Sequence, residues 1–297
     1  MQVNSVKYGK NWFIFSGILT GVSLLFMLIS TIQLGSPVRL GLDFTGGTRL
    51  EYKFDKKVIK SEEINQILNE VGLANSIATI TQGEKPVLII RTQAISDDPA
   101  LDRLNEKLIQ NYGQFEISSL DTVNPLVGPE LLQSGLVALF FTMIGITLYI
   151  SSRFKRDYAI AAITALFHDV IVLMGLFAFL GLYYGVEVDS LFITAVLTTF
   201  GFSVHDTIVV FDRIRENQKL QTTKFKFHDV ANLSVNQVSM RSLNTSLTVL
   251  TTLAFLYFLG GRSTQLFVGA LFIGLAVGTY SSIFLASPLL VWLREKK

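Results

Sequence analysis

The sequence contains no cysteine, so disulfide bonds, thiolate chemistry and cysteine-ligated metal sites are excluded. Histidine is also scarce. The three histidines, at positions 168, 205 and 228, are widely spaced, which argues against a metal centre. Only 16% of the residues are charged, whereas a soluble protein carries about a quarter. Because half of the residues are hydrophobic and the mean hydropathy is +0.47, the composition predicts an integral membrane protein with one soluble insert.

Six apolar stretches predict transmembrane helices, because about 20 apolar residues cross the hydrocarbon core of a bilayer. The first lies within residues 1–32 and is too long for the apolar region of a signal peptide. No A-x-A-like cleavage site follows it, so we interpret it as an uncleaved span. The other five predict a helical bundle over residues 131–297, with spans at about 131–150, 158–182, 190–211, 241–259 and 266–293.

The basic residues predict the orientation of these spans. Outside residues 33–130 there are 15 lysines and arginines, and 14 of them lie in segments on one side of the membrane. These segments are the N-terminus, the 151–157 loop, the 212–241 linker and the C-terminus. Because lysine and arginine accumulate in cytoplasmic loops, we expect both termini in the cytoplasm and residues 33–130 outside it.

Residues 33–130 hold 10 basic and 14 acidic residues and predict an extracytoplasmic domain. Alternating apolar residues predict strands over 48–54, 76–81, 87–92 and 114–122, with a turn at 83–86. Helical spacing predicts helices over 61–71 and 98–111. This β-α-β-β-α-β order is typical of a small ferredoxin-like α+β fold. The domain either contacts cargo or a partner, or serves as a plug or spacer; the sequence leaves both interpretations open.

The octapeptide GLDFTGGT at residues 41–48 joins the first span to this domain, and we single out Gly41, Asp43, Gly46 and Gly47 as a structural motif. Paired glycines permit positive φ or close approach of another backbone. The motif lacks the lysine of a phosphate-binding P-loop, so we expect no phosphate there. It predicts a tight, glycine-dependent junction.

The fourth span contains Asp206, a carboxylate within an otherwise apolar helix. An ionisable residue inside a membrane is costly and indicates a functional site by default. On a helical wheel, Thr199, Ser203 and Asp206 form one polar stripe that faces the bundle interior or a water path. Hydroxyls one turn apart can orient a carboxylate or pass a proton along water.

The fifth span has a second polar stripe, formed by Arg241, Asn244, Thr248 and Thr252. Arg241 can reach a buried carboxylate, and such a pair would keep Asp206 ionised until the two groups separate. A carboxylate that alternates between these environments can carry a proton. The alternative is that Arg241 only extends toward the membrane interface as an anchor.

The third span carries His168 and Asp169 near the middle of the bilayer. Asp169 is either a second proton relay or a structural hydrogen-bond hub. We favour the hub, because the sequence shows no hydroxyl stripe that continues from it. We interpret His168 as an interhelical hydrogen-bond donor.

Taken together, these motifs resemble the SecF family, whose members form the bacterial SecD–SecF complex and are related to the proton-driven RND exporters. The resemblance covers nearly the whole chain. It is carried by GLDFTGGT at 41–48, by Val127-Gly128-Pro129, by residues 200–217 and by the RSLNTS sequence at 241–246. His205 stands where the family more often has asparagine.

The resemblance implies a function in protein export. With SecD, such a subunit uses the proton-motive force to help pull polypeptide outward, after the SecA-driven step through the SecYEG channel. Asp206 corresponds to the proton-carrying carboxylate and Arg241 to its partner, and we add Ser203, Asn244 and Asp169 to the candidate relay. SecD is expected as a separate chain, in the bacterial inner membrane. We expect no cofactor besides the proton gradient, and no nucleic-acid partner.

Two other functions remain open. The chain is alternatively a stand-alone RND-type exporter of small molecules or lipids, which would have to dimerise because such exporters usually carry twelve spans. It is alternatively a membrane scaffold in which Asp206 and Arg241 form a static ion pair. An enzyme is not predicted, because the sequence indicates no set of nucleophile, base and orienting residue.

Overall fold

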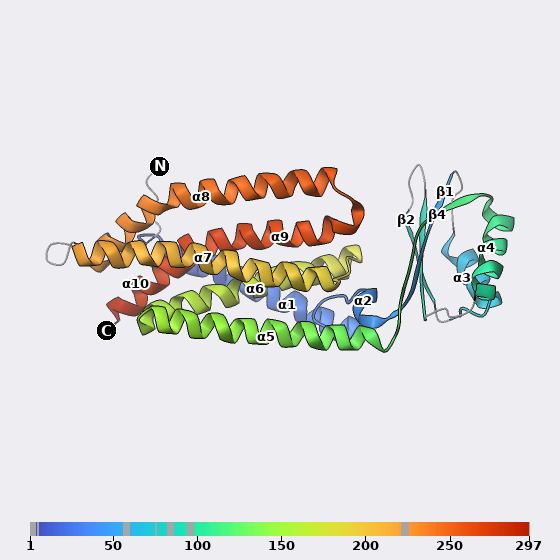
Figure 1. Cartoon of the computed structure of the whole chain (residues 1–297), viewed down its shortest axis with the longest axis horizontal. Coiled ribbons are helices and arrows are strands. Elements are labelled where there is room, and N and C mark those ends of the chain that lie inside the picture. The colour runs from blue at the N-terminus through green and yellow to red at the C-terminus, as the bar shows by residue number, and fades with distance from the viewer. Residues whose placement is uncertain are drawn as a thin grey trace. The chain divides into compact units, whose positions relative to one another are not determined.

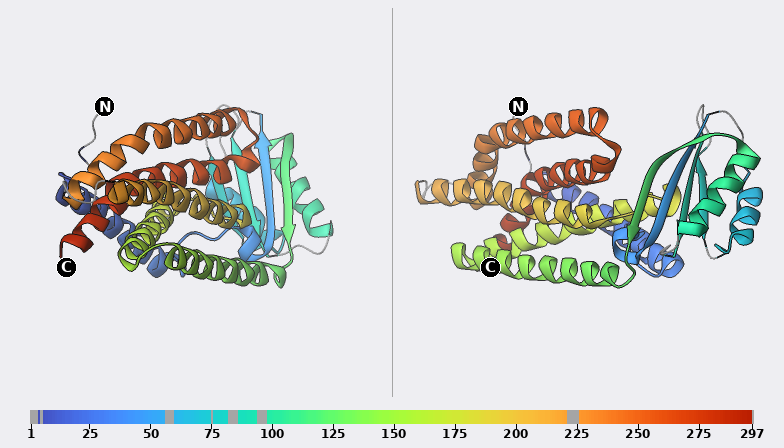
Figure 2. Two further views of the ribbon diagram at one scale, coloured as in Figure 1. Left: turned by 60° about the vertical axis from the view of Figure 1, so that its left-hand side comes forward. Right: turned by 45° about the vertical axis from the view of Figure 1, so that its right-hand side comes forward.

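The computed structural model divides into two compact units, one formed by residues 1–39 and 136–297 and the other by residues 40–135. It describes residues 4, 6–55, 60–74, 76–81, 86–93, 98–220 and 226–296. The first unit is a bundle of long helices. The second unit is a four-stranded sheet with helices on one face (Figures 1 and 2).

Six helical segments are long and apolar enough to cross a membrane, as predicted. The first five are α1 Gly9–Leu34, α5 Val127–Arg153, α6 Arg156–Tyr184, α7 Ser190–Leu220 and α8 Phe227–Leu259. The sixth consists of α9 Arg262–Ser281, a π-helical turn η1 Ser282–Ala286, and α10 Ser287–Glu295. The predicted linker over 212–241 is largely helical, because α7 and α8 extend into it. Residues 221–225 lie outside the described part.

Helices α6, α7 and α9 pack against one another at the centre of the bundle. Helix α1 packs against α6, and α8 packs against α7 and α9 (Figure 1). In the most apolar stretch of α6, half of the residues are buried. The corresponding share is 11% in α8 and none in α5. Helices α5 and α8 therefore present apolar surface that is free to contact lipid or another membrane protein.

The second unit follows the predicted β-α-β-β-α-β order. Its elements are β1 Gly47–Phe54, α3 Ser61–Glu70, β2 Ile77–Thr81, β3 Val87–Thr92, α4 Asp98–Tyr112 and β4 Phe115–Val123. The sheet order is β2-β3-β1-β4 and each neighbouring pair is antiparallel, which is the ferredoxin-like arrangement. A short helix α2, Leu42–Thr45, was not predicted, and residues 83–85 of the predicted turn lie outside the described residues.

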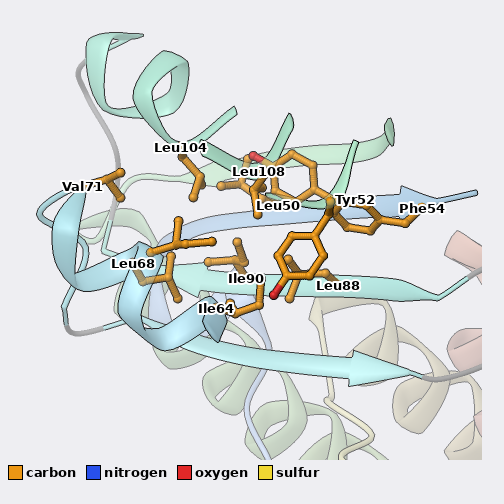
Figure 3. Packing of buried hydrophobic residues seen from close by; sticks show 12 residues of the cluster. Leu50, Tyr52, Phe54, Ile64, Leu68, Val71, Leu88, Ile90, Leu104 and Leu108 are labelled. Atoms are coloured by element: carbon orange, nitrogen blue, oxygen red, sulfur yellow. The ribbon is translucent and has the colours of Figure 1, made fainter. Parts of the chain in front are cut away.

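The core of this domain forms between α3, α4 and one face of the sheet (Figure 3). Leu50, Tyr52 and Phe54 alternate along β1 and point to this side, as a period of two requires. The Tyr52 hydroxyl donates to Asn105 at 2.9 Å, and burial raises the pKa of Tyr52 to about 12. The core is otherwise apolar, which makes the domain an ordinary small α+β unit stabilised by hydrophobic burial.

Candidate functional site

The interior of the helical bundle contains a cluster of buried polar side chains where α6, α7 and α9 meet. Asp169 is its one fully buried carboxylate among the described residues, with an exposed fraction of 0%. Buried hydroxyl groups from the other helices share this interior, and these residues are Thr199, Ser203, Thr207, Thr279, Ser281 and Ser282. A buried carboxylate is tolerated only when it is hydrogen-bonded, so the partners of each acid decide what it can do.

Asp169 has three side-chain hydrogen-bond partners. Ser203 of α7 donates to Oδ2 at 2.6 Å, and Ser281 of α9 donates to the same oxygen at 2.7 Å. His168 Nδ1 lies 3.0 Å from Oδ1. This carboxylate therefore joins α6, α7 and α9 at one level of the bundle, as the predicted hydrogen-bond hub would.

Asp206 lies one turn beyond Ser203 on α7 and is only partly buried. Its closest hydrogen bond comes from Thr279 of α9, whose Oγ1 lies 3.4 Å from Oδ2, a long and therefore weak contact. The Ser242 and Ser246 side chains of α8 lie beside the carboxylate. Within the described chain the Ser242 hydroxyl has no hydrogen bond of normal geometry. Asp206 is thus loosely held and partly open, in contrast to Asp169.

A segment around the end of α9 contacts both acids, and the sequence marked it only through Gly278 and Ser282 as part of a small-residue packing stripe. Thr279 approaches Asp206, Ser281 donates to Asp169, and Ser282 lies 2.8 Å from the Thr207 hydroxyl of α7. The π-helical turn Ser282–Ala286 follows directly. Pro288 is the one feature of the sequence that could have indicated this turn, because it lies inside the predicted sixth span and its nitrogen cannot donate a helical hydrogen bond. Such turns are frequent at functional sites.

Glycines allow α9 to approach α7 closely. A Cβ atom on Gly274 would lie 2.2 Å from Thr199 Oγ1, and one on Gly278 would lie 3.0 Å from Ser203 Cβ. Both glycines belong to a small-residue stripe, with Ala270, Ser282 and Ala286, which we interpret from the sequence as a packing face. Close contact at this face brings the hydroxyl groups of α7 and α9 within reach of the two acids.

The predicted pair of Arg241 with Asp206 is not formed within this chain. Arg241 and Asn244 are exposed on α8, and none of the ion pairs among the described residues involves Arg241. The α8 face next to Asp206 carries Ser242 and Ser246, both buried. Arg241 precedes Ser242 by one position, or about 100° of helical rotation, which turns its stripe away from the bundle.

The glycine motif lies at the base of the second unit. Gly46 and Gly47 have φ angles of 67° and 116°, which side-chain-bearing residues rarely adopt. A Cβ on Gly46 would lie 2.5 Å from Pro125 Cα, and one on Gly47 would lie 2.5 Å from Thr92 O. Gly41 precedes α2 and Asp43 lies in it. The two glycines allow β1 to start against the segment that leads into α5.

Across the described residues, no group of three or more histidine, cysteine, aspartate or glutamate side chains could hold a metal ion. The polar cluster consists instead of two carboxylates, hydroxyls and one imidazole. Groups of these kinds can bind and transfer protons, and a hydroxyl with two nearby acceptors can change its hydrogen bond at low cost.

Comparison with known proteins gives two family matches. The model of the C-terminal region of the protein export membrane proteins SecD and SecF matches residues 104–296, and the model of the SecD/SecF GG motif matches residues 32–58. The chain is 41% identical to the protein translocase subunit SecF of Synechocystis, over 99% of this chain and 95% of that one. It is 42% identical to the SecF of Thermobaculum terrenum, over 91% and 89% of the two chains.

The fold is similar to that of a solved structure. The crystal structure of SecDF, a translocon-associated membrane protein from Thermus thermophilus, superposes with a TM-score of 0.84 at 31% identity. The match covers 99% of this chain but 39% of that longer one. The present chain therefore corresponds to about two fifths of the SecDF polypeptide.

Proposed function

The chain belongs to the SecF family of protein-export membrane proteins, and we propose that it couples the proton-motive force to protein export. In this proposal it is a non-enzymatic accessory subunit of the Sec translocase. The observation that carries the proposal is Asp206, a partly open carboxylate inside a membrane span. Among the described residues it receives one long hydrogen bond from Thr279, and the Ser242 and Ser246 hydroxyls lie beside it. A carboxylate in this setting can bind and release a proton without dismantling the helices around it.

The two acids have different roles in this proposal. Asp206 binds the transported proton, and Ser203, one turn away, connects it to the interior cluster. Asp169 orients Ser203 and Ser281 through two short hydrogen bonds and keeps α6, α7 and α9 in register. The same hydrogen bonds would also let Asp169 take part in a relay, which is the less economical role for a fully buried acid.

A SecD protein is the proposed partner. Some longer relatives are named SecDF, and this chain covers 37–39% of their length. The exposed polar stripe of α8 supports a membrane partner, because an exposed arginine and asparagine are costly in lipid. We propose that SecD covers this stripe and that Arg241 and Asn244 complete the proton pathway from that side.

The remaining assignments follow from the same proposal. The complex works beside the SecYEG channel and the SecA motor, and acts on polypeptide that emerges from the membrane. The distribution of basic residues supports cytoplasmic termini in the bacterial inner membrane, with residues 33–130 outside the cytoplasm. No cofactor is required, because the gradient supplies the energy.

The experiment is protein export into inverted membrane vesicles, with and without a proton gradient, using wild type and Asp206→Asn. We expect the variant to assemble normally and to lose only the gradient-dependent part of export. Asp212→Asn is the matched control, because Asp212 lies on the same helix and pairs with Arg153 and Arg215 instead. If Asp206→Asn keeps gradient-dependent export, the carboxylate is structural and a scaffold function takes precedence.

A further inference from the structure

Three hydroxyl groups, those of Thr279 and Ser281 in α9 and of Ser282 at the start of the π-helical turn, each have at least two possible acceptors. One acceptor is a backbone carbonyl of α9 itself, and the others belong to neighbouring helices. A hydroxyl has a single proton to donate, so it must favour one acceptor at any time. The charge of the neighbouring group decides which acceptor is preferred, because hydrogen bonds to an ionised acceptor are roughly twice as strong as neutral ones.

Thr279 is the clearest case. Its Oγ1 lies 2.9 Å from Leu275 O in its own helix and 3.4 Å from Asp206 Oδ2. The Ser246 hydroxyl of α8 lies 2.7 Å from Thr279 Oγ1 and can donate to it. The Thr279 proton is then free to go to either Leu275 O or Asp206 Oδ2. The longer contact to Asp206 matches a carboxylate that competes weakly for this proton.

Ser281 is bound more firmly. Its Oγ lies 2.7 Å from Asp169 Oδ2 and 3.1 Å from Gly278 O, so the carboxylate is the closer acceptor. Because Asp169 is also bonded to Ser203, the Ser281 position is attached to α6 and α7 together. This position is the fixed point of the segment.

The π-helical turn begins at the next residue. Ser282 Oγ lies 2.8 Å from Thr207 Oγ1, 2.9 Å from Gly278 O and 3.3 Å from Ser203 O. The Ser287 hydroxyl donates to Ser282 O at 3.0 Å. A helix bends where hydroxyls bond to carbonyls of the preceding turn and where its hydrogen-bond ladder changes register. The segment therefore joins a proton-responsive hydroxyl, a fixed point and a bendable turn within eight residues, 279–286.

We propose that Thr279 is a positioning residue that changes its hydrogen-bond acceptor when Asp206 gains or loses a proton, and that the π-helical turn Ser282–Ala286 converts this change into a reorientation of α10. When Asp206 is ionised, the Thr279 hydroxyl turns toward it. When Asp206 is neutral, the hydroxyl returns to Leu275 O and α9 bends differently about Ser281. The inference rests on the proposed function of Asp206 and adds the element that responds to it.

The titratable groups around this segment are few. His205 adjoins Asp206 on α7, and His168 adjoins Asp169 on α6. Tyr280 of α9 lies beside the His168 ring, with centroids 6.3 Å apart, and bonds to Ser16 of α1 at 2.9 Å. Helix α8 contributes Ser242 and Ser246 next to Asp206, while its Arg241 is exposed. Asp206 is thus more exposed than Asp169, and it lies next to Thr279, whose hydroxyl has more than one possible acceptor.

The test uses spin labels on the full chain, co-expressed with a SecD-type partner. The absence of natural cysteines makes labelling direct. One label replaces Glu216 at the end of α7 and the other replaces Lys296 after α10, both exposed. The distance between them is measured in liposomes by pulsed electron paramagnetic resonance. Asp206→Asn imitates the neutral acid and is compared with wild type.

We expect Asp206→Asn to shift the mean distance by roughly 2 Å, the usual size of a helix shift. In a Thr279→Val background the same substitution should produce no shift, because the responding hydroxyl is absent. Thr279→Ser should restore the shift, since it keeps the hydroxyl. Thr164→Val is the matched control, because the Thr164 hydroxyl bonds only to Ile160 O in its own helix and is exposed. In that background the shift should remain.

Two results would overturn the inference. One is an equal shift in the Thr279→Val and wild-type backgrounds; the other is the absence of any shift when Asp206→Asn is introduced into wild type. Gradient-dependent export, measured on the same variants, separates this failure from that of the proposed function. If Asp206→Asn removes gradient-dependent export while the distance stays constant, only the inference fails. If export keeps its gradient dependence, the proposed function fails.

Discussion

The two units of the molecule bury polar groups in different ways. In the helical bundle, Asp169 is fully buried together with a group of serine and threonine hydroxyls, and Asp206 lies partly open beside them. In the second unit, the core is apolar and its tyrosines extend their hydroxyls to the edge. Among the residues described, only the bundle carries a carboxylate that is fully buried in its interior.

This difference separates stability from function. The second unit needs only hydrophobic burial to fold, so its carboxylates remain at the surface, where they cost little. The bundle retains buried acids although lipid and packing alone would stabilise it, and ionisable residues inside a membrane are costly. The polar interior of the bundle is therefore the part of the molecule whose chemistry requires an explanation beyond stability.

The largest predicted effect is in the apolar core of the second unit. Leu104 is fully buried there, and Leu104→Ala removes packed atoms and leaves a cavity. The opening free energy of the β1 and β3 amides should fall by about 3.5 kcal/mol. Hydrogen exchange of the full chain measures this change, and exchange in α6 and α7 should stay as in wild type. A parallel loss in α6 would show that the two units do not fold independently.

The next effect is in the polar interior of the bundle. Asp169→Ala removes the acceptor of Ser203 and Ser281 and leaves both hydroxyls and His168 without their carboxylate partner. The free energy of unfolding should fall by about 3 kcal/mol, as measured by denaturation in mixed detergent micelles. Asp206→Ala should cost less than about 1 kcal/mol, because its hydrogen bond is long. Equal losses for the two acids would remove the distinction between them.

Close packing of α7 against α9 predicts a smaller effect. Gly274→Ala places a Cβ 2.2 Å from Thr199 Oγ1, so the helices must separate or Thr199 must move. The free energy of unfolding should fall by about 2 kcal/mol. Gly201→Ala is the control on α7, because its Cβ would meet no atom within 4 Å. If Gly274→Ala leaves the free energy of unfolding unchanged, the small-residue stripe does not constrain the packing of α7 against α9.

The smallest effect concerns the surface pair of the second unit. The Tyr112 hydroxyl donates to Glu63 at 2.7 Å; this hydrogen bond is the main cause that lowers the pKa of Glu63 below its ordinary 4.5. Burial, followed by the bond to Glu63, raises the pKa of Tyr112 to about 12. The stabilisation from Glu63 is present above pH 4.5 and is lost as the pH falls. That from Tyr112 is complete below pH 10 and is lost as the pH rises toward 12.

Tyr112→Phe should therefore lower the stability of this unit by about 1 kcal/mol at neutral pH. The substitution should also reduce the loss of stability at acidic pH, and it should remove the part of the loss at alkaline pH that comes from Tyr112. Hydrogen exchange of the full chain at several pH values tests both. An unaltered pH dependence in Tyr112→Phe would contradict the assignment of the pair.

The sequence predicted the second unit more closely than the bundle interior. Strand β3 was placed correctly and the other strands within one residue at either end, because alternation in a half-buried strand is a strong signal. In the bundle the same approach oriented α7 correctly, since Thr199 and Ser203 are buried. It did not identify the face of α8 that packs against the bundle, which carries Ser242 and Ser246 rather than Arg241. Lipid is as apolar as a protein core, so an apolar helix gives no contrast between the two sides.

The sequence also did not predict the π-helical turn or the contact of Thr279 with Asp206. The turn arises from one change in hydrogen-bond register near Pro288, a local event that does not disturb the apolar pattern. The contact of Thr279 with Asp206 joins positions 73 residues apart and depends on how closely glycines let α9 approach α7. Neither feature is encoded in the spacing of one segment.

The most direct test of the central claim is proton flux. The chain and a SecD-type partner are placed in liposomes that contain a pH-sensitive dye, and a proton gradient is applied. We expect proton flux for wild type and for the Asp212→Asn control, and none above the empty-liposome rate for Asp206→Asn. Flux that persists in Asp206→Asn at the wild-type rate would contradict the claim that Asp206 carries the proton.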